Sequence, residues 1–222
     1  ERDSYMLRYL AKDSVPKIEI EKELEEYFRR YSLELNVLNI TTDLGVPSFM
    51  CINIDRTGIG PAVSVGLKAS LNPIEAIRGA IVESQQVRQW IRYSYAQDGK
   101  PKILDPRNIN DVKKRGYFWY GLDKINKINF LIKSETEKMK NIKSPVESLS
   151  ELIQHLLKKD LGIYMVDLTP DKVRRKGFYV VKAVIPKLHP LYLEENFRCL
   201  HSERLIRHLG NRQVNLYPHP FM

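Results

Sequence analysis

The sequence has no long hydrophobic run, since no stretch approaches the roughly 18 uncharged apolar residues that a membrane-spanning helix needs. It also has no GxxxxGK[ST] motif, so phosphates are not held by a P-loop. Only two of the 222 residues are cysteines, and CxxC and HExxH motifs are absent, which removes the usual sequence signals of a protein-ligated zinc site. Two free thiols, Cys51 and Cys199, are typical of a cytoplasmic protein. We therefore predict a cytoplasmic protein that does not associate with a membrane.

The composition is that of a globular protein with a basic surface, with 43% hydrophobic and 28% charged residues and a net charge of +9. Residues 100–144 carry twelve Lys and Arg against five Asp and Glu. Such a segment suits nucleic acid, an acidic peptide or nucleotide phosphates, and it is equally typical of a solvated surface. The aromatic residues 117–120 are contiguous, which favours a buried strand over base-stacking platforms. A nucleic-acid-binding domain is therefore the less favoured alternative.

The hydrophobic pattern predicts helices and strands in mixed order. The expected helices span 1–10, 20–31, 73–93, 108–114 and 144–158. The expected strands span 33–40, 48–54, 61–67, 163–166 and 178–185, with a loop at 100–106. This order predicts an α/β (α+β) fold with a mixed sheet and long buried helices in one domain, 1–222. Because the chain opens in helical sequence without a cap, we expect that an N-terminal part is missing.

The predicted helix 73–93 carries the most informative polar residues. Asn72 is a good N-cap, and Pro73 is favoured at the first helical position. Glu83 and Gln86 lie about 60° apart on one face at 100° per residue. Small side chains share this face: Ala76, Gly79 and Ala80. A carboxylate on a buried face needs a partner, either an arginine or a metal ion, and the small residues leave room for a backbone or a ligand.

Three segments together resemble the YcaO superfamily. The opening ERDSYML resembles the family's ERDA-type helix, and residues 66–88 resemble its DP..A...A..E..Q.R helix, with Asn72 where aspartate is usual. The final PHPFM, residues 218–222, is similar to the proline-rich tail of peptide-modifying members. The resemblance covers the whole chain, as the C-terminal portion of a single YcaO-like domain with its tail.

The resemblance implies an ATP- and Mg²⁺-dependent cyclodehydratase that activates a backbone amide of a ribosomally made precursor peptide. A Cys, Ser or Thr side chain attacks the amide, ATP phosphorylates the resulting oxyanion, and an azoline forms. The alternative within the family is thioamide formation with an external sulfur source. The expected partners are the precursor peptide and a leader-peptide-binding protein or domain, and a homodimer is left open.

The resemblance also assigns roles to particular residues. It gives Glu1 to Mg²⁺ and Arg2 to phosphate, it makes Glu83 a second metal ligand, and it adds Gln86 and Arg88 to the nucleotide site. Arg88 lies about 140° from Glu83 on a straight helix, so the two are not expected to touch one ligand, and a structural role for Arg88 is the alternative. The family's preceding glutamates are absent, so this chain alone should bind ATP weakly.

The tail supplies the remaining candidate residues. Peptide-cyclising members end in P-x-P-x-P, so Pro218, Pro220 and Met222 are the catalytic candidates, and Met222 stands where the last proline would be. Prolines keep a terminal segment extended at low entropic cost, whereas the alternative is a frayed terminus. We expect the tail to dock near the active site, and its deletion to affect peptide modification more than stability.

Overall fold

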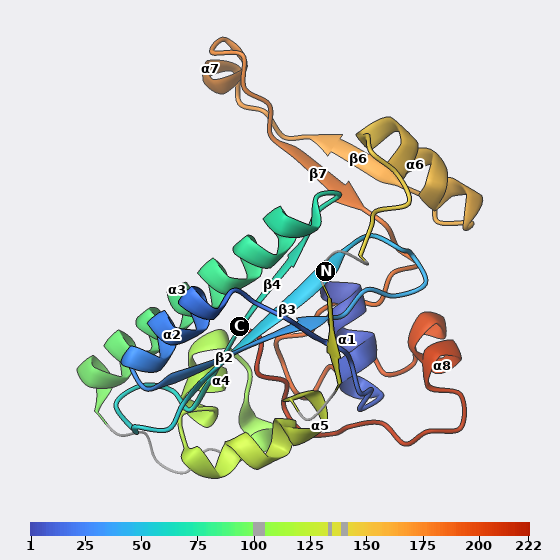
Figure 1. Ribbon diagram of the computed structural model, residues 1–222. Coiled ribbons are helices and arrows are strands. Elements are labelled where there is room, and N and C mark those ends of the chain that lie inside the picture. The colour runs from blue at the N-terminus through green and yellow to red at the C-terminus, as the bar shows by residue number, and fades with distance from the viewer. Residues whose placement is uncertain (100–104, 133–134, 139–141) are drawn as a thin grey trace.

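A five-stranded mixed sheet forms the centre of the computed structural model, which describes residues 1–99, 105–132, 135–138 and 142–222 (Figure 1). The strands are β1 (Lys17–Ile18), β2 (Leu33–Asn39), β3 (Ser48–Asp55), β4 (Val63–Ala69) and β5 (Thr136–Glu137). Their spatial order is β4-β3-β2-β1-β5, antiparallel except for the parallel pair β1–β5. The mixed sheet predicted from the sequence is therefore confirmed, with β4 at one edge.

The helices are α1 (Arg2–Leu10), α2 (Lys22–Arg30), α3 (Pro73–Asp98), α4 (Val112–Phe118), α5 (Asn129–Ile132), α6 (Leu149–Lys158), α7 (Asp171–Arg174) and α8 (Glu203–Leu209), with 3₁₀ turns at Pro106–Asn108 and Leu122–Ile128. The five predicted helices correspond to α1, α2, α3, α4 and α6 with different boundaries, whereas α5, α7 and α8 were not predicted. Helix α3 extends beyond the predicted end at 93. Helix α6 begins later than predicted, because Ser148 and Glu151 form a capping box there. Most of the expected loop 100–106 lies outside the described residues.

The prediction of a strand at residues 117–120 is wrong. Asp111 caps α4 by accepting a hydrogen bond from the Lys114 backbone N–H at 2.7 Å, so the aromatic run falls at the end of this helix. The carbonyl of Trp119 accepts a hydrogen bond from the Val63 N–H of β4 at 3.2 Å, and the Trp119 side chain is fully buried. The aromatic residues therefore cover the edge of the sheet without joining it as a strand.

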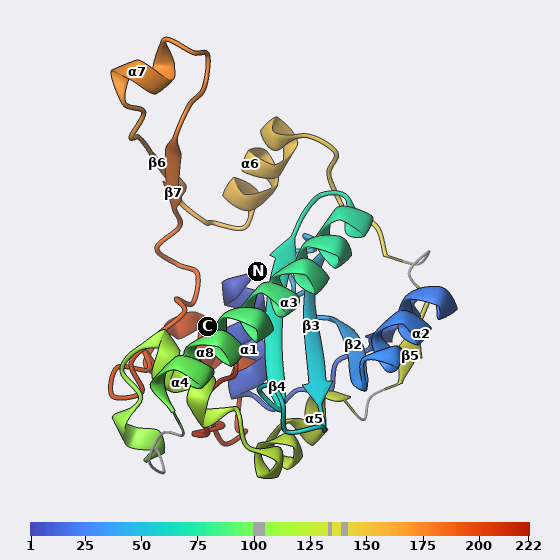
Figure 2. The same cartoon turned by 90° about the vertical axis from the view of Figure 1, so that its left-hand side faces the viewer.

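Helices cover both faces of the sheet (Figures 1 and 2). Helices α2 and α3 pack on one face, around core residues such as Phe49 and Cys51. Helix α1 packs on the other face and is buried along almost its whole length. Helix α3 buries one side only, since Val82 and Tyr93 on its outer side are 57% and 65% exposed. The expectation of long buried helices is therefore met by α1, whereas α3 is only half-buried.

Helix α3 and strand β4 approach each other unusually closely at Gly66. A Cβ atom on Gly66 would lie 2.2 Å from the Ala80 carbonyl oxygen and 2.4 Å from the Ser84 nitrogen. The buried Ala76 and Ala80 extend this contact along the helix. The small residues of α3 therefore serve the approach of a backbone, one of the two uses that the sequence left open.

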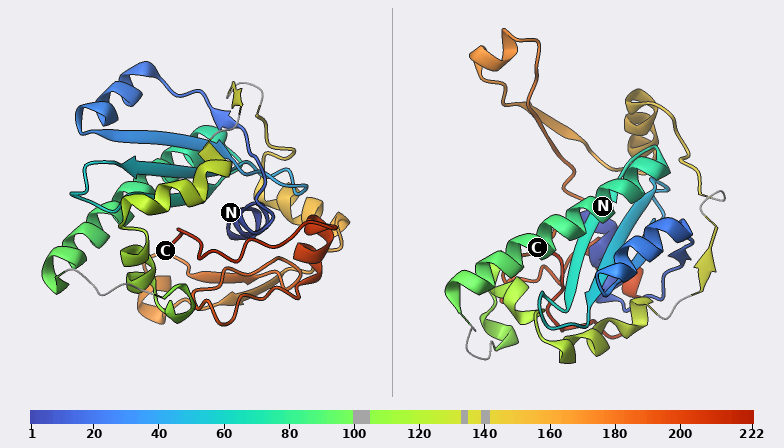
Figure 3. Two further views of the ribbon diagram at one scale, coloured as in Figure 1. Left: turned by 90° about the horizontal axis from the view of Figure 1, so that it is seen from below. Right: turned by 60° about the vertical axis from the view of Figure 1, so that its left-hand side comes forward.

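The last two predicted strands form a separate hairpin. Strands β6 (Tyr164–Asp167) and β7 (Val181–Val184) pair only with each other, and the ribbon with α7 at its tip projects from the rest of the molecule (Figure 1). The C-terminal segment instead runs beside α1, as the view from below shows (Figure 3). Among the described residues, no helix is long and apolar enough to cross a membrane.

Candidate functional site

The free edge of β4 collects two carboxylates from distant parts of the chain. The Leu67 N–H donates a hydrogen bond to Glu83 at 2.6 Å, and the Ala69 N–H donates one to Glu1 at 3.0 Å. An edge strand presents backbone N–H groups that need partners, and here carboxylates supply them. Glu83 reaches the edge because α3 lies so close to Gly66. The structure therefore brings together the two carboxylates that the resemblance assigned to Mg²⁺.

Charges of both signs surround the Glu83 carboxylate. Burial raises the pKa of Glu83, the hydrogen bond from Leu67 lowers it, and the neighbouring Glu1 carboxylate raises it further. Arg2 and Lys68 act on Glu83 in the opposite direction, as nearby positive charges. The cluster thus contains two carboxylates and two cationic side chains at one edge of the sheet, which we call the β4-edge site (Glu1, Arg2, Lys68, Glu83).

The donors of the β4-edge site fit a magnesium–nucleotide complex. Mg²⁺ prefers oxygen ligands and is commonly held by one or two protein carboxylates together with substrate phosphates. No group of three or more His, Cys, Asp or Glu residues that could hold a metal occurs within the described part of the chain. A two-carboxylate site therefore suits an ion that completes its coordination with phosphate oxygens, and Arg2 and Lys68 suit those phosphates. Gln86 is exposed one turn further along α3.

Arg88 lies elsewhere, at the turn between β3 and β4. Its guanidinium forms an ion pair of 2.6 Å with Asp55, which is fully buried. Burial alone would raise the pKa of Asp55, but hydrogen bonds from Thr57 and Arg88 bring it below the ordinary 3.8. Arg88 thus contacts the end of β3 and Glu83 contacts β4, so the two side chains have different partners, in line with their angular separation on α3.

The C-terminal tail is anchored in the core between α1 and α4. The Tyr9 hydroxyl donates a hydrogen bond to the Pro218 carbonyl at 2.9 Å, and Arg115 donates one to the His219 carbonyl at 3.0 Å. Pro218, His219 and Pro220 are all buried. Arg115 also forms an ion pair of 2.5 Å with Glu195, and both side chains are fully buried. The tail is therefore part of the folded core and does not fray.

The end of the tail approaches the same face of α3 as Glu83. A Cβ on Gly116 would lie 2.2 Å from Ile91 and 2.7 Å from the Met222 sulfur, so these side chains meet at α4. Glu83 and Ile91 are eight residues apart, which places them on one face about 12 Å apart along the axis. The structure brings Met222 to this face, whereas Pro218 and Pro220 lie deeper, beside α1.

In the described part of the basic segment 100–144, three of the cationic side chains are already paired. Arg115 is buried, Lys113 pairs with Asp98 at 2.6 Å, and Arg107 pairs with Asp105 at 2.8 Å. Four of its lysines lie outside the described residues: Lys100, Lys102, Lys133 and Lys140. The described residues therefore do not favour the nucleic-acid alternative.

A sheet edge that carries two carboxylates and two cationic side chains is a candidate site for a metal–phosphate ligand. The model of the YcaO cyclodehydratase family, described as ATP- and Mg²⁺-binding, matches residues 1–189. The chain therefore belongs to the YcaO cyclodehydratase family, which confirms the resemblance read from the sequence. None of the curated proteins matches it significantly.

Solved structures share the fold. A heterocyclase in complex with substrate and cofactor matches with a TM-score of 0.76 and 19% identity, covering 100% of this chain and 30% of its own. The heterocyclase TruD matches with a TM-score of 0.69 and 19% identity, and the match covers 100% of this chain and 31% of TruD. YcaO from Methanopyrus kandleri, bound with AMPPCP and Mg²⁺, matches with a TM-score of 0.59 and 18% identity, and the match covers 99% of this chain and 54% of that protein. The chain thus spans about a third of the two heterocyclases and about half of the Methanopyrus protein.

Sequence reasoning missed three contributors to these sites. Lys68 ends an apolar strand, and its position gave no sign that it would face Glu83. The ion pairs of Arg88 with Asp55 and of Arg115 with Glu195 join residues 33 and 80 positions apart. The sequence offered one signal for these ion pairs, namely that a buried arginine needs an acidic partner. That signal does not identify which Asp or Glu is the partner.

Proposed function

We propose that the protein to which this chain belongs is an ATP- and Mg²⁺-dependent cyclodehydratase that forms azolines from Cys, Ser or Thr in a ribosomally made precursor peptide. The observation that carries the proposal is the β4-edge site, where Glu1 and Glu83 meet with Arg2 and Lys68 in a YcaO chain. Bound Mg²⁺–ATP would supply the phosphoryl group that converts the amide oxygen into a leaving group.

In this proposal the residues of the chain hold and orient the reactants. Glu1 and Glu83 face the metal, Arg2 and Lys68 face phosphate oxygens, and Gln86 lies within reach of the nucleotide from the next turn of α3. The hydrogen bonds from β4 fix both carboxylates, so little side-chain freedom is lost when the ion binds. Arg88 is left out of this set because its guanidinium is held by Asp55.

The role of the C-terminal tail in this proposal is to hold the chain end in a fixed place. The hydrogen bonds to the Pro218 and His219 carbonyls fix the path of the last residues, and Met222 ends at α4 beside Ile91. A chain end held on the Glu83 side of α3 is suited to line the place where a peptide amide would lie. The precursor peptide and a leader-binding partner remain part of the proposal, and a homodimer and a cytoplasmic location stay predictions.

The test compares Glu83→Gln with Glu75→Gln in the purified full-length protein, using phosphate release with Mg²⁺–ATP and a Cys-containing peptide. Glutamine keeps an oxygen for the Leu67 N–H, so the fold should persist, but it removes the negative charge that the metal needs. Glu75 is an exposed residue of the same helix, bonded only to Ser70 among the described residues, and serves as the matched control.

We expect Glu83→Gln to lose ATP turnover and Glu75→Gln to retain it. Turnover of Glu83→Gln at the wild-type rate would refute the metal assignment. The mass of the peptide product separates the two family reactions. Loss of one water identifies azoline formation, and exchange of one oxygen for sulfur identifies the thioamide alternative.

A further inference from the structure

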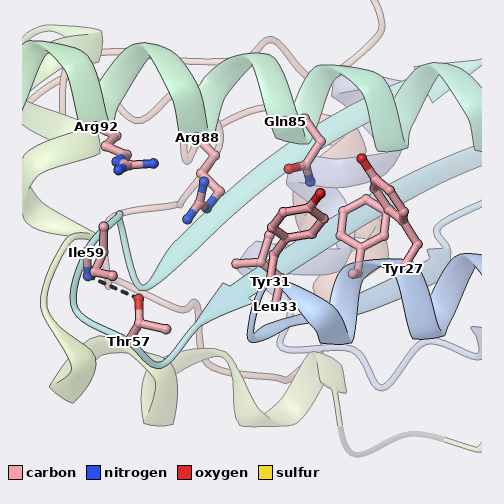
Figure 4. Close-up of a pocket in the computed structure, with 9 residues that line it drawn as sticks. Tyr27, Tyr31, Leu33, Thr57, Ile59, Gln85, Arg88 and Arg92 are labelled. Carbon is pink, nitrogen blue, oxygen red and sulfur yellow. Dashed lines mark hydrogen bonds between the residues drawn. The ribbon is translucent and has the colours of Figure 1, made fainter.

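A concave site lies between α3 and α2, away from the β4-edge site (Figure 4). Its volume is about 400 Å³, within the range of ligand-binding clefts. We call it the α2–α3 cleft, and its lining residues are Tyr27, Phe28, Tyr31, Leu33, Thr57, Ile59, Gln85, Arg88 and Arg92. In Figure 4, Gln85, Arg88 and Arg92 extend from α3 towards the tyrosines of α2 and the β3–β4 turn.

The charge of this cleft is positive. It is lined by two arginines and by no aspartate or glutamate. The 2.6 Å ion pair with Asp55 balances the charge of Arg88. The buried Nε atom of Arg88 has no hydrogen-bond partner in the described residues. Arg92 is exposed and takes part in no ion pair or hydrogen bond found there. The cleft therefore retains one uncompensated guanidinium, at the end closed by Ile59.

The apolar part of the cleft consists of a buried floor and exposed walls. Phe28 and Leu33 on the floor are 6% and 9% exposed. The walls are formed by three large side chains that remain exposed: Tyr27 at 54%, Tyr31 at 61% and Ile59 at 59%. The two tyrosine rings meet edge-on with centroids 5.3 Å apart, which orders both. Exposed tyrosines beside arginine are the composition that is enriched in the core of protein interfaces.

This cleft is distinct from the β4-edge site. At 100° per residue, Arg88 and Arg92 lie about 140° and 180° from Glu83 around α3. The backbone N–H groups of the adjoining turn are already used, since Thr57 N–H bonds to Asp55 and Ile59 N–H bonds to Thr57. The Thr57 and Ile59 N–H groups are therefore not free to bind a phosphate, whereas the tyrosine walls offer contact to an apolar group.

We propose that the α2–α3 cleft binds an acidic peptide segment that carries a large apolar side chain. The apolar side chain packs between the tyrosines and over Leu33, and an adjacent carboxylate pairs with Arg92. The inference extends the proposed function, because a peptide substrate or partner held here would be captured on the face of α3 opposite the Glu83 site. It depends on that function only for the identity of the peptide, since the chemistry of the cleft is independent of ATP.

The test measures fluorescence anisotropy of a short fluorescein-labelled peptide in which glutamates flank a Leu-Phe pair, without nucleotide. Arg92→Glu should weaken binding at least about tenfold, since it replaces an attraction by a repulsion. Tyr31→Ala should weaken it by a similar factor. Arg78→Glu is the matched control, because Arg78 is an exposed arginine of the same helix outside the cleft and its charge change is identical.

Comparator peptides and a nucleotide assay identify other occupants. The peptide with glutamine for glutamate and the peptide with serine for Leu and Phe should both bind at least about tenfold more weakly. Equal losses for Arg92→Glu and Arg78→Glu would mean non-specific attraction to a basic chain and would overturn the proposal. Competition by inorganic phosphate but not by the unlabelled peptide would assign the cleft to phosphate instead, and Arg92-dependent self-association in sedimentation would assign it to a second copy.

Failure of this inference is distinguishable from failure of the proposed function. Peptide binding that depends on Arg92 in a protein without ATP turnover would support the cleft and refute the cyclodehydratase. ATP turnover that depends on Glu83, with no Arg92-dependent peptide binding, would support the cyclodehydratase and refute the cleft.

Discussion

Replacement of Gly66 by alanine should separate α3 from β4, and with it Glu83 from the Leu67 N–H. The added Cβ would lie 2.2 Å from the Ala80 oxygen, 2.4 Å from the Ser84 nitrogen and 2.9 Å from the Glu83 Cβ. Two of these atoms belong to the backbone of α3, so no rotation of a side chain relieves the contact, and the helix must move. Overpacking of a core costs about 1–3 kcal/mol, and a backbone contact on this scale belongs at the upper end, about 3 kcal/mol.

The assay is thermal unfolding followed by circular dichroism. For a chain of this size, each kcal/mol shifts Tm by about 2–4 °C, so Gly66→Ala should lower Tm by about 6–12 °C. The control is Gly162→Ala, whose Cβ would meet only the Tyr164 ring at 3.5 Å, an ordinary contact, and whose Tm should change by less than about 2 °C. A Gly66→Ala protein that melts within about 2 °C of the wild type would refute the close-approach argument.

Three further predictions concern burial and charge. Because burial holds the pKa of Glu83 above 4.5, the fold favours its protonated form, so this stabilisation is complete at a pH below 4.5 and is lost as the pH rises through the raised pKa. The Tm of Glu83→Gln should therefore be higher than that of the wild type at pH 7 and equal to it at a pH below 4.5. Arg115→Met leaves the buried Glu195 with Arg198 as its remaining ion-pair partner, so it should cost about 3 kcal/mol in urea unfolding, the lower end of the range for a broken buried ion pair. Burial raises the pKa of Cys51 to about 12, so a thiol reagent should titrate only Cys199 in the native protein and both after unfolding; two fast thiols would contradict this.

The burial of the tail changes one expectation drawn from the sequence. Deletion of residues 218–222 was expected to affect modification more than stability. The tail carries Phe221, which is 3% exposed, and a carbonyl that is bonded to the buried Arg115. Its removal would open the core and unpair buried polar groups, so it should also reduce stability. Met222→Ala changes only the chain end and is the better probe of the site.

The sequence determined most of the local elements and pointed to Glu1, Arg2 and Glu83 of the β4-edge site, but not to Lys68. Hydrophobic patterning identified β2 to β4 and α1 to α3, with alternation in the segment 33–40 and a helical stripe in the segment 1–10, because the periodicity of a segment follows from which of its faces is buried. The Asn72 side chain caps α3 as its position predicted, by accepting a hydrogen bond from the Ile74 N–H at 3.0 Å. The YcaO motifs pointed to Glu1 and Glu83 before their shared strand was known.

Only the tertiary structure decided which partners these residues meet. Periodicity indicates that a face is buried but does not say against what, so the contact of Glu83 with the edge of β4, the pairing of Arg88 with Asp55 and the exposure of the β6–β7 hairpin could not be predicted. The aromatic residues 117–120 have high strand propensity, but a cap and the packing of Trp119 against β4 placed them in a helix end. Pairings between residues far apart in the chain depend on how whole elements pack, and that packing is a property of the folded molecule and not of any single segment.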